Sequence, residues 1–195
     1  MSSPSARGRS SGLRTPFDFD LAYLAGDDPR AQSGFHGSAE RWEAARRPIV
    51  EAIDGDGIFP DVGCANGLLM ESVVEWSPHA IEPYGVDFAP GLVELARRRL
   101  PQWADRIWCA DVRTWDLPLR FDFVHTRLEI GAIERLLGFG RRLIVSSDGS
   151  FRRPDSPRAE PVAERLRALG LEVAGERYER SDEHQVEIAV AWVDV

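Results

Sequence analysis

The sequence contains no lysine, because all 24 of its basic residues are arginines. This absence excludes Schiff-base formation, catalysis by a lysine amine and phosphate binding by a P-loop lysine. Cysteine is scarce as well, and the spacing of Cys64 and Cys109 fits neither a zinc motif nor a disulfide scaffold. We therefore predict no metal site and a protein that is reduced.

Long apolar runs are also missing. No stretch approaches the roughly 18 residues that cross a bilayer, and the first residues lack the apolar core of a secretory signal. The first 17 residues are rich in serine and arginine, which is typical of a disordered bacterial tail and faintly of a transit peptide. We expect a cytoplasmic protein without membrane contacts.

Acidic residues exceed basic ones by 32 to 24, which gives a net charge of −8. Because proteins that bind nucleic acids usually present a basic face, this balance makes nucleic acid an unlikely partner and favours a small-molecule substrate. The length of 195 residues corresponds to about one domain with a tail. Residues 1–34 are rich in Ser, Gly, Pro and Asp and are predicted to form a flexible N-terminal tail, whereas residues 35–195 form the folded domain.

Strand and helix patterns alternate along that domain. A helix is expected from Ala39, interrupted at Pro48, and a brief one is expected from Glu129 to Leu137. Strands are predicted at Ile58–Val62, Tyr84–Val86, Arg106–Cys109, Phe121–Thr126, Leu143–Val145, Leu171–Tyr178 and Val186–Val193. The alternation indicates an α/β three-layer sandwich with a mostly parallel sheet. The short turn before the last strand makes that strand antiparallel.

Small and acidic residues follow the first three predicted strands. The turn Gly63–Gly67 follows the first strand, Asp87 closes the second, and Asp111 comes directly after the third. In open α/β sheets ligands bind beyond the carboxyl ends of the strands, and small residues there let a ligand approach the backbone. A carboxylate at the second strand suits ribose hydroxyls, and one at the third suits an adenine amino group.

These motifs together resemble a known family. The series Asp61–Gly67, Tyr84–Asp87, Ala110–Val112 and Phe121–Val124 is similar to the class I S-adenosylmethionine-dependent methyltransferases, and it extends over residues 40–195. The resemblance implies a seven-stranded Rossmann-like sheet with an antiparallel last strand. It also implies S-adenosylmethionine as cofactor and methyl transfer to an acceptor, leaving S-adenosylhomocysteine.

The resemblance further implies a cofactor site. Asp61 would organise the loop and the cofactor amino group, and Asp87 would hold the ribose hydroxyls. Phe88 would lie against adenine, with Asp111 at its amino group and Val112 beside the ring. The residues passing under the methionine and ribose would be Gly63, Cys64, Ala65, Asn66 and Gly67. Ala65 departs from the family pattern, because a glycine is usual there.

The short connection from Val124 to Arg142 also departs from the pattern, because it leaves room only for a stunted helix where relatives often frame the acceptor pocket. His125 is the best candidate for a general base by its ordinary pKa, although a structural histidine is the stronger reading. One alternative is therefore a catalytically reduced S-adenosylmethionine-binding domain with a regulatory or assembly role. A nicotinamide-dependent oxidoreductase fits less well, because the glycine spacing differs from Gly-x-Gly-x-x-Gly. The acceptor, the use of a base and the oligomeric state stay open.

Overall fold

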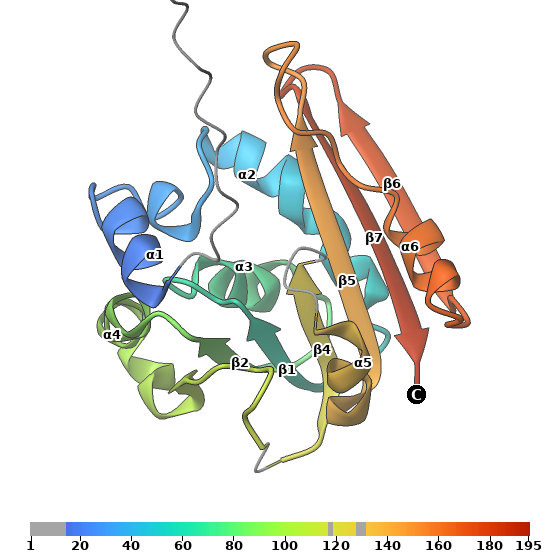
Figure 1. The fold of residues 1–195 in the computed structure, drawn as a ribbon, viewed down its shortest axis with the longest axis horizontal. Helices are drawn as coiled ribbons and strands as arrows, with labels where there is room; N and C mark the ends of the chain where they lie inside the picture. Colours follow the sequence, from blue (N-terminus) through green and yellow to red (C-terminus); the bar gives the residue numbers. More distant parts are fainter. Residues whose placement is uncertain (1–14, 117–118, 128–131) are drawn as a thin grey trace, which may run out of the picture.

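The computed structural model describes residues 15–116, 119–127 and 132–195. Seven strands form one sheet: β1 (Gly57–Val62), β2 (Ile81–Asp87), β3 (Ile107–Cys109), β4 (Phe121–Arg127), β5 (Gly140–Ser150), β6 (Gly175–Ser181) and β7 (Val186–Asp194). Their order is β3-β2-β1-β4-β5-β7-β6 (Figure 1). The strands from β1 to β5 pair in parallel, and β7 is antiparallel to both of its neighbours. The predicted three-layer α/β fold with its reversed last strand is thus confirmed.

Two different layers cover the sheet. One face carries α2 (Ala39–Arg46), η2 (Arg47–Ala52), α3 (Leu68–Trp76) and α4 (Pro90–Arg99), followed by the 3-10 turn η3 (Pro101–Arg106). As predicted, Pro48 interrupts the first helix, because α2 ends at Arg46 and a 3-10 turn with the proline in its first positions takes over. The buried side chains of this layer include Phe59, Phe123 and Ile144, one from each central strand.

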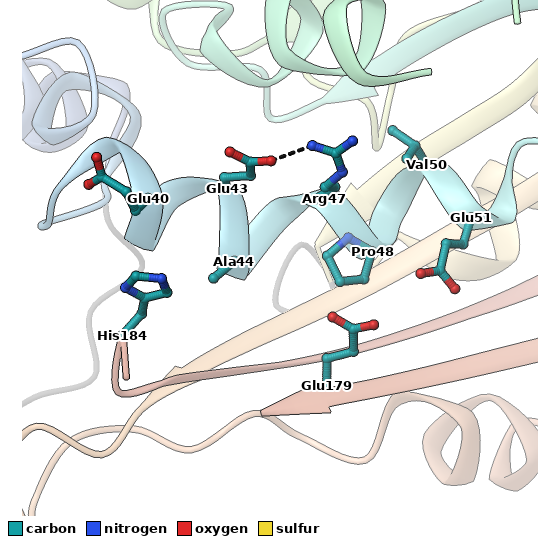
Figure 2. A pocket seen from close by; sticks show the side chains of 9 residues that line it. All are labelled: Glu40, Glu43, Ala44, Arg47, Pro48, Val50, Glu51, Glu179 and His184. Carbon is teal, nitrogen blue, oxygen red and sulfur yellow. Dashed lines mark hydrogen bonds and ion pairs between the residues drawn. The ribbon is translucent and has the colours of Figure 1, made fainter. Parts of the chain in front are cut away.

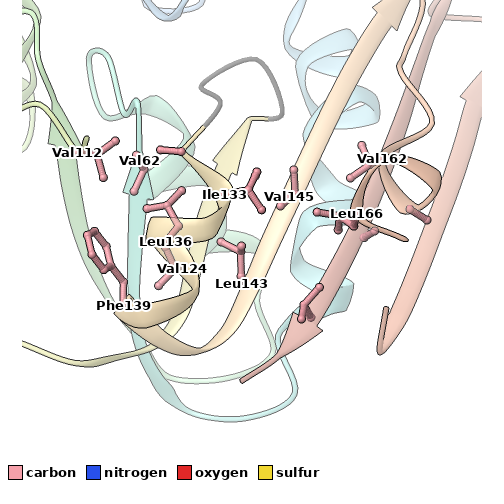
Figure 3. Close-up of a cluster of buried hydrophobic side chains, with 14 of the residues drawn as sticks. Val62, Val112, Val124, Ile133, Leu136, Phe139, Leu143, Val145, Val162 and Leu166 are labelled. Atoms are coloured by element: carbon pink, nitrogen blue, oxygen red, sulfur yellow. The ribbon is translucent and has the colours of Figure 1, made fainter. Parts of the chain in front are cut away.

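The opposite face has a thinner cover. It consists of α5 (Ile133–Leu136), η5 (Leu137–Phe139) and α6 (Val162–Ala168), packed on alternate residues of the central strands such as Val62, Val124 and Val145 (Figure 3). The described part of α5 is a helix of four residues, so the prediction of a brief helix is consistent with it, although residues 128–131 lie outside the described ranges. The described residues between β3 and β4 form turns rather than a helix.

Two short helices lie within the N-terminal segment that the sequence predicts to be a flexible tail. Residues 1–14 are outside the described ranges, but α1 (Pro16–Tyr23) and η1 (Ala31–Ser33) lie within the predicted tail. Helix α1 contacts α4, Tyr23 packs against Ala65, and the Pro29 carbonyl accepts a hydrogen bond from Asn66. The composition is that of a loop, but these contacts with the folded domain give the segment burial that local composition does not reveal.

Candidate cofactor site at the strand ends

The carboxyl ends of β1, β2 and β3 meet at one edge of the sheet. The register places Val62 beside Val86 and Asp87 beside Cys109, so these strands end within a few residues of the same level. The Ala110 amide donates to the Asp87 carbonyl at 2.9 Å, which continues the alignment by one residue. The sheet therefore brings Gly63, Asp87 and Asp111, which are far apart in sequence, to one edge.

The loop after β1 is wound by three left-handed residues. Gly63, Ala65 and Gly67 have φ angles of 84°, 48° and 77°. Glycine adopts this conformation freely, but alanine does so at a cost, so Ala65 holds the loop shape against its own preference. Its methyl group is buried with Ala89 and Leu92. Gly63 is the exposed member of the loop, and its lack of a side chain leaves the backbone open to a ligand.

Asp87 ties the first two strand ends together. Its Oδ2 accepts a hydrogen bond from the Ala65 amide at 2.8 Å, and its Oδ1 accepts one from the Ala89 amide at 2.9 Å. Burial raises the pKa of this carboxyl, while the amide hydrogen bonds oppose the rise. Each carboxylate oxygen has two lone pairs, so two amides leave Asp87 with the capacity to accept from ribose hydroxyls.

The other loop residues fix the loop from within. Cys64 is buried against Met70 and Ile107, and its burial raises the pKa of the thiol well above the ordinary value, which suits the neutral filler expected from the sequence. Asn66 is fully buried, and its main-chain carbonyl accepts a hydrogen bond from the Arg99 side chain at 2.7 Å. These two residues support the loop rather than face the solvent.

The third strand end is arranged less simply. Arg113 forms a two-pronged ion pair with Asp111, with contacts of 2.7 Å and 2.9 Å, and this pairing lowers the pKa of the Asp111 carboxyl. The Val112 side chain points into the core beneath α5, although its backbone remains at the strand end. Phe88 is half-buried directly after Asp87. An adenine amino group at Asp111 would therefore share that carboxylate with Arg113.

A buried hydrogen-bonded chain crosses the three central strands. His125 Nδ1 lies 2.7 Å from Asp61 Oδ1, and His125 Nε2 lies 2.9 Å from the Ser146 hydroxyl. The side chains of Asp61 and His125 are 4% and 1% exposed, and Ser146 is buried as well. Sequence reasoning singled out the first two residues and missed Ser146. The missed signal is that Ser146 stands two residues after the core residue Ile144, as His125 does after Phe123.

The geometry disfavours His125 as the general base that intrinsic pKa suggested. Both ring nitrogens are engaged inside the sheet and the ring stacks on Phe59, with the ring centres 6.1 Å apart. A base must reach the proton that it removes, and a ring buried in this way offers no nitrogen to an acceptor. This geometry favours a structural role for His125, and both readings of the residue stay predictions.

Two cavities lie outside the loop after β1, and the second one reaches Arg113 beside the third strand end. One, of about 400 Å³, is lined by α2, η2, Glu179 of β6 and His184, and carries four glutamates (Figure 2). The other, of about 590 Å³, lies between α5 and α6 and is lined by Arg113, Arg135 and Arg165 among others. Neither includes the loop after β1, so the candidate cofactor site is defined by the strand ends.

The fold matches solved methyltransferase structures. N-methyltransferase NodS from Bradyrhizobium japonicum WM9, in complex with S-adenosyl-L-homocysteine, gives a TM-score of 0.65 at 15% identity, with 92% of this chain and 97% of that chain covered. Magnesium protoporphyrin IX methyltransferase from Synechocystis PCC 6803, with bound S-adenosylmethionine, gives 0.60 at 16% identity, with 95% and 100% covered. The [4+2]-cyclase SpnF gives 0.54 at 18% identity, with 80% of each chain covered.

No protein-family model matches the sequence, and no curated protein matches it in sequence. The similarity is therefore one of structure, carried by strand order and connectivity at low identity. The chain has the seven-stranded fold of the class I S-adenosylmethionine-dependent methyltransferases. None of its described helices is both long and apolar enough to cross a membrane.

Proposed function

We propose that the protein transfers a methyl group from S-adenosylmethionine to a small-molecule acceptor. The observation that supports this best is the meeting of Gly63, Asp87 and Asp111 at one sheet edge, in a fold whose solved neighbours bind S-adenosyl compounds. The strand ends of an open α/β sheet are where such folds bind ligands.

The residues at this edge fit the proposed cofactor. Gly63 would let the methionine part approach the backbone, Asp87 would accept from the ribose hydroxyls, and Phe88 would offer a half-buried ring to adenine. When bound, the cofactor supplies a methyl group that its positively charged sulfur already activates. The chain's own task is then to hold the acceptor in line and to exclude water, and such positioning alone contributes up to about 7–11 kcal/mol in favourable cases.

The net charge is the support for proposing a small-molecule acceptor. The net charge of −8 opposes binding of a polyanion such as RNA, whose affinity depends on basic contacts to phosphates. The Synechocystis neighbour is named for a small-molecule substrate, magnesium protoporphyrin IX. A small acceptor also needs no extended basic surface beside the strand ends.

Calorimetry tests the cofactor part of the proposal. S-adenosylhomocysteine should bind saturably with one site per chain, whereas NADH should not bind. Binding of NADH alone would overturn the choice of cofactor. Methyl transfer is tested by incubating the protein with S-adenosylmethionine labelled on the methyl group and a pool of metabolites, where label should appear in a small-molecule product.

A second candidate is a catalytically reduced S-adenosylmethionine-binding domain with a regulatory or assembly role. The four-residue α5 supports it, because the described part of the connection from β4 to β5, residues 132–139, contains only this helix and a short 3-10 turn to frame an acceptor. The fold is also shared by a protein named as a cyclase. Saturable binding of S-adenosylhomocysteine without a labelled product from any pool would favour this candidate.

A further inference from the structure

The buried chain of Asp61, His125 and Ser146 follows from a shared pattern in three adjacent strands. On β1, β4 and β5 a core residue is followed, two positions later on the same face, by a polar one: Phe59 by Asp61, Phe123 by His125, and Ile144 by Ser146. Side chains two residues apart point to the same side of a strand. The polar residues therefore form a layer directly above the apolar core, near the carboxyl ends of β1 and β4 and in the interior of β5.

The hydrogen bonds in this layer determine which ring nitrogen of His125 carries the proton. An ionised carboxylate only accepts hydrogen bonds, so the contact with Asp61 requires a proton on His125 Nδ1. In a neutral ring Nε2 then accepts, and the Ser146 hydroxyl is its donor. Asp61 thus selects the tautomer of His125, Ser146 gives the remaining ring nitrogen a partner, and stacking on Phe59 holds the ring plane.

This arrangement leaves one oxygen of Asp61 without a partner. His125 takes Oδ1, and none of the hydrogen bonds among the described residues involves Oδ2, while the side chain as a whole is 4% exposed. Arg46 and Asp61 attract each other electrostatically, but the ion pair of Arg46, at 3.0 Å, is with Asp148. A nearly buried carboxylate with an open oxygen, two residues before the exposed Gly63, is suited to a ligand that carries a cationic donor.

We propose that His125 and Ser146 are positioning residues, which hold the Asp61 carboxylate for the ammonium group of a bound S-adenosyl compound. This inference rests on the proposed function and adds two residues that act through Asp61 without touching the ligand. It predicts that the two residues affect only ligands that carry the amino-acid end of the cofactor.

Paired calorimetric titrations test the inference. S-adenosylhomocysteine carries the ammonium group, whereas 5′-methylthioadenosine has the same adenosine and thioether but lacks the amino-acid end. His125→Leu removes the donor to Asp61 and should weaken S-adenosylhomocysteine binding about tenfold, with methylthioadenosine binding changed by less than about twofold. His125→Asn keeps an amide donor near the place of Nδ1 and should restore most of the affinity.

His79→Leu is the matched control. His79 faces Asp56 at 4.0 Å at the amino-terminal end of the sheet, so its loss removes a histidine–aspartate pair remote from the strand ends. It should change neither affinity. If His125→Leu left the ratio of the two affinities unchanged, the positioning role would be overturned and the proposed function would stay intact.

Ser146→Ala decides the matter if His125→Leu does not fold, as judged by circular dichroism. It keeps the Asp61 contact but removes the hydrogen-bond partner of Nε2, so the ring is held less firmly and S-adenosylhomocysteine alone should bind about threefold more weakly. An unchanged ratio of the two affinities in this variant would contradict the inference. Failure of the unaltered protein to bind S-adenosylhomocysteine at all would instead remove the proposed function, and this inference with it.

Discussion

The Asp87 carboxylate accepts a hydrogen bond from the Ala65 amide at 2.8 Å. This contact links the end of β2 to the middle one of the three left-handed residues in the loop after β1. The two residues are 22 positions apart in the sequence and belong to two separate motifs. The same carboxylate is our candidate for the ribose hydroxyls. The loop and the proposed ligand therefore depend on one side chain, and changes at either residue should affect both.

Asp87→Ala should weaken binding of S-adenosylhomocysteine by about 1–3 kcal/mol, because it removes charge-assisted hydrogen bonds. Calorimetry on the folded variant measures this change. Asp155→Ala, in an exposed loop after β5, is the control and should bind normally. Unchanged affinity in a folded Asp87→Ala protein would refute the ribose assignment.

Substitutions at Ala65 should separate backbone strain from side-chain packing. Ala65→Gly relieves the left-handed strain but loses a buried methyl group and gains unfolded-state entropy, so its free energy of unfolding should change by less than about 1 kcal/mol. Ala65→Val places a β-branched residue at a φ of 48° and should destabilise the protein by at least about 2 kcal/mol. Urea denaturation compares the two, and a valine variant as stable as the glycine variant would contradict the strained loop.

Arg46 should matter for folding rather than for binding. It is buried, pairs with Asp148 at 3.0 Å, and stacks on the rings of Trp42 and Phe35. Arg46→Ala should cost about 3–5 kcal/mol, because it leaves a cavity and removes one partner of a largely buried aspartate. Arg46→Met keeps the stacking volume and should cost less. Thermal unfolding ranks the two variants, and equal stability of Arg46→Ala and the unaltered protein would show that the pair contributes nothing.

Glu187 should make the free energy of unfolding depend on pH in the acidic range. Arg158, the Ala159 amide and the Tyr178 hydroxyl all bind its buried carboxylate, and they lower its pKa from 4.5 to about 2. Because the folded pKa lies below the unfolded one, the stabilisation is fully present above pH 4.5 and is lost as the pH falls towards 2.

Urea denaturation at pH 7 and pH 3 measures the Glu187 contribution. The unaltered protein should lose more stability between these pH values than Glu187→Gln does, by about 1–2 kcal/mol after allowance for the exposed side of Arg158. Glu176→Gln, at an exposed residue on β6, is the control and should behave like the unaltered protein. Identical pH dependence in Glu187→Gln would contradict this role.

Local patterns allowed most of the fold to be predicted. The seven predicted strands all correspond to observed ones, because alternating strand and helix signals and turn residues are encoded within short windows. Lengths were less predictable: β5 runs from Gly140 to Ser150, whereas only Leu143–Val145 was expected. Its later residues are small and polar, and only pairing with β7 on one side extends them as a strand.

The sequence alone determined the succession of strands along the chain, the loop from Gly63 to Gly67 and the acids that follow the second and third strands, because each is a local signal. Only the tertiary structure decided that Asp111 turns to Arg113, that Tyr23 packs over Ala65, and that His125 lies between Asp61 and Ser146. These contacts join residues from separate strands or loops, and a side chain's partner across a sheet depends on register. Register is set by the packing of the whole sheet, which no short window of sequence contains.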